Sequence, residues 1–316
     1  MARAGGSISW QRLVPLAFIL LAGCRGSSAA PEHMWGNRGV KPGELVKPRA
    51  IAIGPDDRLY IVDWTARIQA FNRDGKFDGA SFHTPDYRNG RPSGLSVVME
   101  GEGKGNVIVS DSHYHTVRVY TPDGIELTDK KIGGNPGTEP GQLSYVSDVL
   151  CDKHGNFYVA EFGENQRISK FDKHAKFVKC WGAPGKEINQ FARIRAMTLG
   201  PDGNLYVADA CNHRIQVFTT DGDFVRTFGK EGTGPGELSY PYDVAIVPGT
   251  TPYLYVVEFG GSRVQKFTLE GKSLGTWGSA GRAPGQLCSP WALAVDSRGL
   301  VHVVDSLNDR IQRIDF

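Results

Sequence analysis

Paired cysteines, long apolar runs and the common catalytic signatures are scarce in this 316-residue sequence. Its five cysteines include no Cys-x-x-Cys pair, which argues against a structural zinc site. The apolar run at residues 13–20 is too short for a membrane-spanning helix, which needs about 20 residues. The nucleophile elbow, the Walker loop and the His-Glu-x-x-His motif are all absent, so the enzyme classes that depend on them are excluded.

An excess of charge of one sign is also missing. The whole chain has 36 Lys and Arg against 34 Asp and Glu, a net charge of +2. Residues 1–23 hold two arginines and no acid, so the remainder has 34 charges of each sign and a net charge of 0. A neutral domain offers no bulk attraction to nucleic acid or anionic lipid, and no nucleic-acid partner is expected.

The first residues have the pattern of a targeting segment. Arg3 and Arg12 precede the apolar run, and residues 21–24, Leu-Ala-Gly-Cys, resemble the lipobox of bacterial lipoproteins. This order predicts a signal peptide at residues 1–23, lipid on Cys24 and a flexible tether over residues 24–32. The protein is then exported and held by its lipid on the periplasmic or surface side of a bacterial membrane. The alternative is an ordinary signal peptide with a chance cysteine.

The rest of the chain repeats one four-strand unit. In each copy an apolar strand is followed by an alternating strand that ends in an acid, a third strand that usually begins with arginine, and a last strand that usually ends before glycine. The six first strands begin about 44 to 54 residues apart, which is the period of a propeller blade. They begin at Pro48, Pro92, Val146, Ile194, Pro241 and Pro290.

The sixth copy stops at Phe316, after its third strand. Trp35 and Gly36 form an aromatic-Gly ending with no strands before it, so we expect residues 33–36 to supply the missing strand and close the ring. The predicted fold is all-β: a six-bladed β-propeller of four-stranded antiparallel blades over residues 33–316.

This repeat resembles the NHL family. Loops of the type Pro-Gly-x-Leu occur at residues 42–45, 140–143, 235–238 and 284–287, and GNLYVAD and NHRIQVF occur at 203–209 and 212–218. The second copy lacks the loop and the arginine, and the fourth has residues 187–191 in place of the loop. Both of these blades are therefore expected to be irregular.

Ligands of such propellers usually lie at the mouth of the central channel. The residue after each first-strand start is expected there, which gives Arg49, Ser93, Ser147, Arg195, Tyr242 and Trp291. Two opposed arginines beside an aromatic wall can hold an anionic, ring-containing ligand; the alternative is a solvated rim paired with Asp148 or Asp243. The loop after the second strand carries aromatic residues in alternate blades, which are either a contact surface or blade packing: Trp64, Phe162 and Phe259.

An acid that recurs in all six blades and an arginine that recurs in five are expected to stabilise the blade. The acids are Asp63, Asp111, Glu161, Asp209, Glu258 and Asp305, and the arginines are Arg67, Arg167, Arg214, Arg263 and Arg310. His113 and His115 form an isolated His-x-His pair whose rings would share one side of an extended segment, with His213 in the corresponding loop two blades on. We expect exposed loop histidines there, and no metal or cofactor. Four cysteines, at 151, 180, 211 and 288, allow three disulfide pairings.

The repeat also resembles that of an enzyme, the peptidyl-hydroxyglycine amidating lyase, whose propeller holds zinc through three histidines. Of five positions compared, only His115 matches; the others are Arg195, Trp291, Ala210 and Phe259. NHL propellers of animal tripartite-motif proteins bind RNA or protein, but this chain lacks their RING domain, B-box and basic excess. The sequence thus favours a non-catalytic module for a protein, peptide or glycan ligand. The alternative is a hydrolase or lyase with a nonstandard site around Arg49, Arg195, His115, Tyr242 and Trp291.

Overall fold

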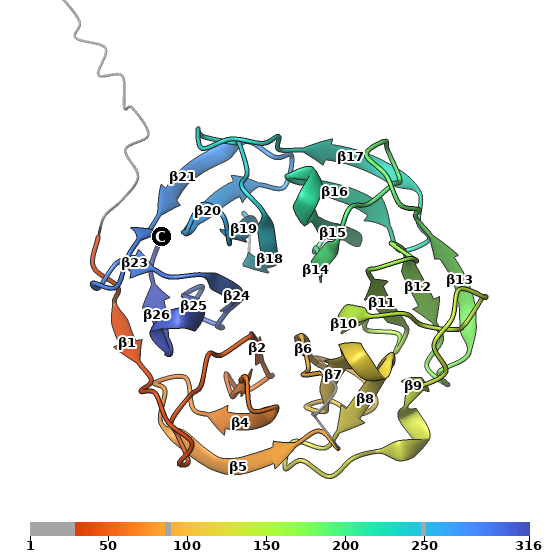
Figure 1. Cartoon of the computed structure of the whole chain (residues 1–316), viewed down its shortest axis with the longest axis horizontal. Helices are drawn as coiled ribbons and strands as arrows, with labels where there is room; N and C mark the ends of the chain where they lie inside the picture. The colour runs from red at the N-terminus through yellow and green to blue at the C-terminus, as the bar shows by residue number, and fades with distance from the viewer. Residues whose placement is uncertain (1–28, 86–89, 248–250) are drawn as a thin grey trace, which may run out of the picture.

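A computed structural model describes residues 29–85, 90–247 and 251–316. Six four-stranded antiparallel sheets surround a central axis, with the first strand of each sheet innermost (Figure 1). This confirms the predicted six-bladed β-propeller. In the described residues, no helix is long and apolar enough to cross a bilayer. Cys24 and the signal peptide lie outside the described part of the chain.

The strand bounds follow the repeat. Blades one to three are β2 Ala50–Ile53, β3 Leu59–Val62, β4 Arg67–Phe71 and β5 Phe77–His83; β6 Gly94–Val97, β7 Val107–Asp111, β8 Thr116–Tyr120 and β9 Ile132–Gly133; and β10 Val146–Cys151, β11 Phe157–Glu161, β12 Ile168–Phe171 and β13 Phe177–Trp181. Blades four to six are β14 Ile194–Leu199, β15 Asn204–Asp209, β16 Arg214–Thr219 and β17 Phe224–Phe228; β18 Pro241–Val247, β19 Tyr253–Glu258, β20 Arg263–Thr268 and β21 Ser273–Trp277; and β24 Pro290–Val295, β25 Val301–Asp305, β26 Arg310–Ile314 and β1 His33–Trp35.

The two ends of the chain close the ring, as the sequence predicted. Strand β1 pairs antiparallel with β26, with Trp35 opposite Ile311 (Figure 1). The Trp35 ring lies 4.9 Å from the ring of Phe71 in blade one, so the closing strand also contacts the neighbouring blade. The end of the predicted tether lies against the domain, because Glu32 forms a 3.1 Å ion pair with Arg313.

The hydrophobic core consists of six clusters, each between two neighbouring blades. Successive side chains of a strand point to opposite faces of its sheet, so each strand feeds two clusters. In β15, Leu205 and Val207 pack toward blade three, whereas Tyr206 and Ala208 pack toward blade five. Both faces of each blade are thereby covered, which explains why the second strands are almost entirely buried.

The recurrent acid and arginine form a buried ion pair in five blades, which confirms their structural interpretation. In blade four, Arg214 Nε donates to Asp209 at 2.9 Å and another guanidinium nitrogen donates to the Gln190 carbonyl of the preceding loop. Blade two, which lacks the usual arginine, pairs Asp111 with Arg118 at 2.9 Å. The equivalent pairs of the other four blades are Asp63–Arg67, Glu161–Arg167, Glu258–Arg263 and Asp305–Arg310.

Of the two blades expected to be irregular, only blade two is. Its outer strand β9 has two residues and follows a short 3-10 turn, η2 Thr128–Lys130. The expectation is wrong for blade four, which has four full strands. There Phe191 is fully buried where other loops place leucine, and Asn189 adopts a positive φ of 61° where they place glycine. Asparagine tolerates this left-handed conformation better than most residues, so the loop keeps its shape.

Candidate functional site

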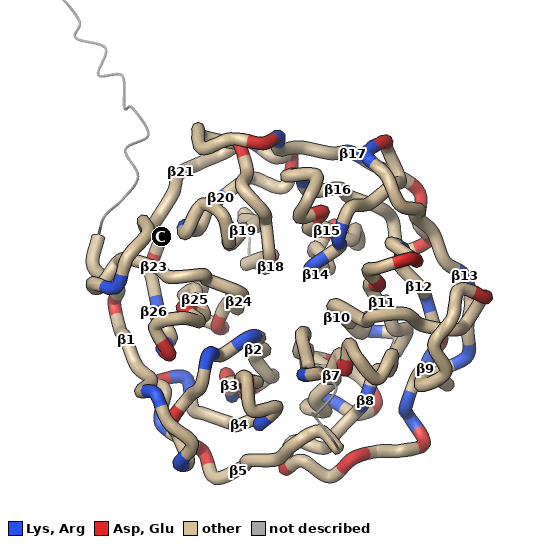
Figure 2. Tube along the Cα trace, viewed as in Figure 1, with Lys and Arg blue, Asp and Glu red and all other residues tan. Residues whose placement is uncertain are grey.

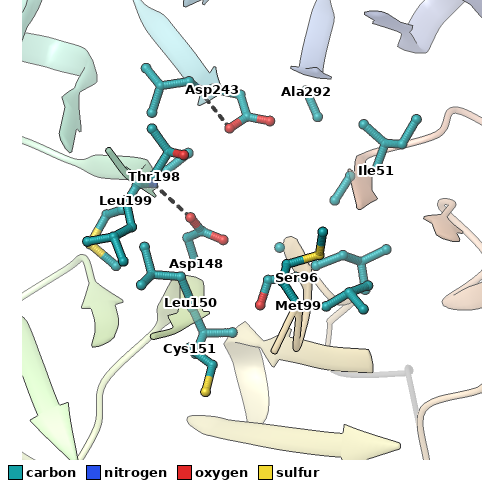
Figure 3. A pocket seen from close by; sticks show the side chains of 18 of the residues that line it. Ile51, Ser96, Met99, Asp148, Leu150, Cys151, Thr198, Leu199, Asp243 and Ala292 are labelled. Atoms are coloured by element: carbon teal, nitrogen blue, oxygen red, sulfur yellow. Dashed lines mark hydrogen bonds between the residues drawn. The ribbon is translucent and has the colours of Figure 1, made fainter. Parts of the chain in front are cut away.

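A cavity of about 630 Å³ runs along the central axis between the innermost strands (Figure 3). Five of the six residues predicted at the channel mouth line it: Arg49, Ser93, Arg195, Tyr242 and Trp291. The sixth, Ser147, is buried, and its hydroxyl donates to the Ala160 carbonyl. The Ser93 hydroxyl is also engaged, because it lies 2.9 Å from the Ser147 carbonyl and 2.5 Å from Ser112 Oγ.

Both predicted arginines stack on one tryptophan. The guanidinium carbon of Arg49 lies 4.7 Å from the centroid of the Trp291 ring, and that of Arg195 lies 5.2 Å from it. Arg195 also lies 4.6 Å from the Tyr242 ring. Cations above aromatic faces are stabilised by the ring quadrupole. The opposed arginines of blades one and four therefore meet at Trp291 of blade six.

The three loop aromatics extend this arrangement outward. Phe259 stacks on Tyr242 with centroids 4.5 Å apart and planes at 15°, and Trp64 lies 5.4 Å from the Arg49 guanidinium. Phe162 lies 5.9 Å from the guanidinium of Arg193. Trp64 is 41% exposed, whereas the other two are half-buried. Trp64 and Phe259 thus adjoin the channel mouth, whereas Phe162 contacts Arg193 outside it.

The arginines of the mouth lack acceptors for part of their hydrogen-bonding capacity. Arg195 is 7% exposed, and its Nε and that of Arg49 are buried without a hydrogen-bond partner in the described structure. Burial and the charges of Arg195 and Arg91 lower the pKa of Arg49 to about 9. Burial also lowers the pKa of Arg195. Figure 2 shows basic positions beside the central opening next to β2 and β14.

Two carboxylates that the sequence interpretation left outside the site lie directly below the mouth. Asp148 and Asp243 line the cavity and point toward its middle (Figure 3). Burial raises the pKa of Asp148 to about 7. Burial and the charge of Asp148 raise that of Asp243 to about 8. Comparison of the six first strands could have identified these two acids, because the other four blades have a small residue at the same position. These residues are Ala50, Gly94, Ala196 and Ala292.

Known proteins match this chain over parts of its length. A protein-family model described as a 6-bladed beta-propeller matches residues 143–278. Peptidylglycine alpha-amidating monooxygenase of Rattus norvegicus is 28% identical over 187 residues, which cover 55% of this chain and 18% of that protein. NHL repeat-containing protein 3 of Mus musculus is 27% identical over 180 residues, 52% of this chain and 50% of that one. The protein is a six-bladed β-propeller related to NHL-repeat proteins.

Solved structures agree with this propeller in fold. A virginiamycin B lyase from Staphylococcus aureus, solved with quinupristin, has a TM-score of 0.59 at 19% identity and covers 89% of this chain and 85% of its own. A streptogramin B lyase structure has a TM-score of 0.58 at 15% identity, covering 88% of this chain and 95% of its own.

Of the two sequence relatives, the chain spans less than a fifth of the rat monooxygenase and half of the NHL protein.

Two loop histidines join neighbouring blades. His115 Nδ1 accepts the backbone N–H of Tyr145 at 3.0 Å, and His213 accepts that of Tyr240 at 3.3 Å. The expected extended segment around His113 is wrong, because η1 Ser112–Tyr114 is a 3-10 turn and His115 is left-handed at a φ of 52°. Among the described residues, no three His, Cys, Asp or Glu side chains are grouped as metal ligands.

The remaining cysteines of the propeller are separate thiols. Cys151, Cys180, Cys211 and Cys288 form no disulfide, so none of the three pairings left open by the sequence occurs in this structure. Cys151 lines the inner part of the channel, on the last residue of β10, and burial raises the pKa of its thiol to about 11. This thiol is therefore protonated at neutral pH and is a poor nucleophile.

Proposed function

We propose that this propeller is a non-catalytic recognition module that holds an anionic group of its ligand between Arg49 and Arg195. One observation carries the proposal: two guanidinium groups share Trp291, and each has a buried Nε without an acceptor. The guanidinium of Arg195 forms no hydrogen bond in the described structure and lines the cavity, and a carboxylate offers it two acceptors in the planar geometry that guanidinium prefers. Tyr242 and Trp291 pack edge to face at 5.9 Å and form the aromatic wall beside these arginines.

Among the protein, peptide and glycan ligands that the sequence left open, this chemistry favours a peptide or protein segment with a carboxylate. A neutral glycan brings aromatic stacking but leaves both arginines without an anion. We further propose that lipid on Cys24 holds the propeller at a bacterial membrane, on the periplasmic or cell-surface side. In cells, Cys24→Ala is expected to move the protein from the membrane to the soluble fraction; continued membrane retention contradicts the anchor.

The recognition site is tested with 3-phenylpropionate, a carboxylate with one aromatic ring, by isothermal titration calorimetry. Arg195→Gln is expected to weaken binding by about tenfold or more, since charged hydrogen bonds contribute about 1.5–3 kcal/mol. Arg226→Gln is the matched control, because Arg226 stacks on Tyr206 at 5.6 Å but donates to the Leu269 carbonyl outside the channel. Equal affinities of wild type and the Arg195 variant contradict the proposal.

The second candidate is a propeller lyase, which is favoured by the match to amidating monooxygenases. Its zinc chemistry requires three protein ligands. Metal content of the protein, purified without chelators or a histidine tag and measured by mass spectrometry, separates the two candidates. About one zinc per chain supports the lyase, and absence of metal removes the metal-dependent enzymes from consideration.

A further inference from the structure

Directly below the arginines, the channel presents two carboxylates that have no cationic partner in contact. Asp148 Oδ2 accepts the Met197 N–H at 2.8 Å, and Asp243 Oδ2 accepts the Leu293 N–H at 2.9 Å, each from the following blade. Neither forms an ion pair with a described residue. The backbone thus fixes both side chains with their charge directed at the cavity (Figure 3).

The repeat accommodates these carboxylates by placing small residues beside them. A methyl group on Gly94, in blade two, would lie 2.8 Å from Asp148 Oδ1 and 2.8 Å from the Ser147 carbonyl. Blade four, which separates the two acids, has Ala196 at the same level. The space at the centre of this level is therefore left to solvent or ligand, and two oxygens face it from blades three and five.

The anionic and cationic groups of the channel occupy consecutive levels. Arg195 is one strand position before the alanine that lies level with the acids, and strand positions are about 3.3 Å apart along the axis. The guanidinium of Arg195 and the two carboxylates line one cavity without forming an ion pair, so a ligand that carries both charges can contact both kinds of group. Arg195 itself is 7% exposed, has no hydrogen bond in the described structure, and lines the same cavity.

We propose that the channel binds an α-amino-acid zwitterion, with its carboxylate at Arg49 and Arg195 and its ammonium at Asp148 and Asp243. The zwitterion is a free amino acid; a short peptide, whose ammonium and carboxylate lie on different residues, is the other outcome of the test. This inference rests on the proposed function and specifies its ligand class. The cavity volume of about 630 Å³ lies within the usual range for small-molecule sites. Ile51 and other apolar residues of the inner channel receive the ligand's apolar part (Figure 3).

The charges around the acids give the site a distinctive pH dependence. Arg195 on β14 faces both carboxylates and lowers their pKa, Asp148 raises that of Asp243, and burial raises both. Arg49 and Tyr242 are the other titratable groups at this end of the cavity. A ligand ammonium favours the ionised acids, so it binds better as pH rises toward about 8, whereas a ligand with only a carboxylate binds better as pH falls.

Three matched probes test the proposal on the full chain by calorimetry: L-phenylalanine, 3-phenylpropionate without the amine, and 2-phenylethylamine without the carboxylate. At about pH 8, L-phenylalanine is expected to bind about tenfold tighter than either analogue, and this advantage over 3-phenylpropionate falls at about pH 6. Asp148→Asn with Asp243→Asn is expected to abolish the advantage and retain 3-phenylpropionate binding. The dipeptide Phe-Phe, measured in parallel, separates a peptide from a free amino acid.

The outcomes distinguish this inference from the proposed function. If L-phenylalanine binds no tighter than 3-phenylpropionate while both require Arg195, the zwitterion is wrong and the anion site stands. If 3-phenylpropionate binds independently of Arg195, the anion site is wrong as well, and absence of binding by every probe overturns both. Circular dichroism and thermal melting establish that the variants are folded; asparagine keeps an acceptor for each backbone N–H, and Asp148→Asn alone is the milder second variant.

Discussion

The paired acids of the channel are expected to make the free protein less stable as pH rises. The pKa of Asp148 is about 7 and that of Asp243 about 8, against 3.8 for an unperturbed aspartate. At these two groups the folded state therefore binds more protons than the unfolded state between about pH 4 and pH 8, and their contribution to stability falls as pH rises through that window. The direction is opposite to that of an aspartate whose pKa is lowered by a partner.

The size of the effect follows from the shifts. Between about pH 5 and pH 8, each group is expected to cost on the order of 3 kcal/mol of unfolding free energy, because one pH unit corresponds to about 1.4 kcal/mol for a group protonated only in the folded state. Water entering the cavity reduces this figure. Asparagine does not titrate and has nearly the same shape, so Asp148→Asn with Asp243→Asn removes this pH-dependent cost.

Urea unfolding of wild type and the double variant at about pH 5 and pH 8 measures the effect. The difference between the two proteins, rather than either curve alone, is the quantity of interest, because aspartates such as Asp202, whose pKa is lowered, stabilise the fold in the opposite direction. The double variant is expected to gain several kcal/mol relative to wild type on going from about pH 5 to pH 8. A difference constant to within about 1 kcal/mol refutes the assignment of two buried, mutually repelling carboxylates.

Three further variants test the structural residues. Arg214→Ala is expected to cost about 3–5 kcal/mol of unfolding free energy, since it leaves Asp209 buried without its ion pair; a loss below about 1 kcal/mol in urea unfolding contradicts this. Trp35→Ala removes the closing strand's contact with Phe71 and is expected to cost about 2–3 kcal/mol, measured by thermal melting. His213→Ala is expected to cost about 1 kcal/mol and leave metal content unchanged; a drop in metal content contradicts its interpretation as a residue that joins blades.

The fold was predictable because each blade repeats the same requirements. Each copy has alternating strands, a positive-φ residue in the loop and an acid facing an arginine, with few exceptions. A strand that is hard to recognise in one copy can therefore be placed from its equivalents in the others. The closing strand followed from Trp35 and Gly36, which had no strands of their own. Blade four shows where matching residue by residue fails. Phe191 fills the volume that leucine fills in other loops, and Asn189 adopts the positive φ that glycine adopts there, so the loop keeps its shape without the motif.

The candidate site was predictable only in part. Strand position placed Arg49 and Arg195 at the mouth, but their meeting at Trp291 depends on side-chain rotamers in three blades, which sequence spacing does not specify. The acids at 148 and 243 were considered only as partners of the arginines, whereas the structure gives them backbone partners instead.

The comparison of two arginines in blade four separates stability from function. An arginine equivalent to Arg214 occurs in nearly every blade. The Arg214 guanidinium donates hydrogen bonds to an acid and to two loop carbonyls. Arg195 breaks the repeat, is as well buried, and has no such partner. Burying a guanidinium without acceptors costs stability, and the same free energy becomes available to a ligand that supplies them. Asp148 and Asp243 break the repeat one strand position further on, and their carboxylates accept backbone N–H groups but have no cationic partner in contact. The positions where this propeller departs from its repeat are therefore those where a ligand can form the strongest new interactions.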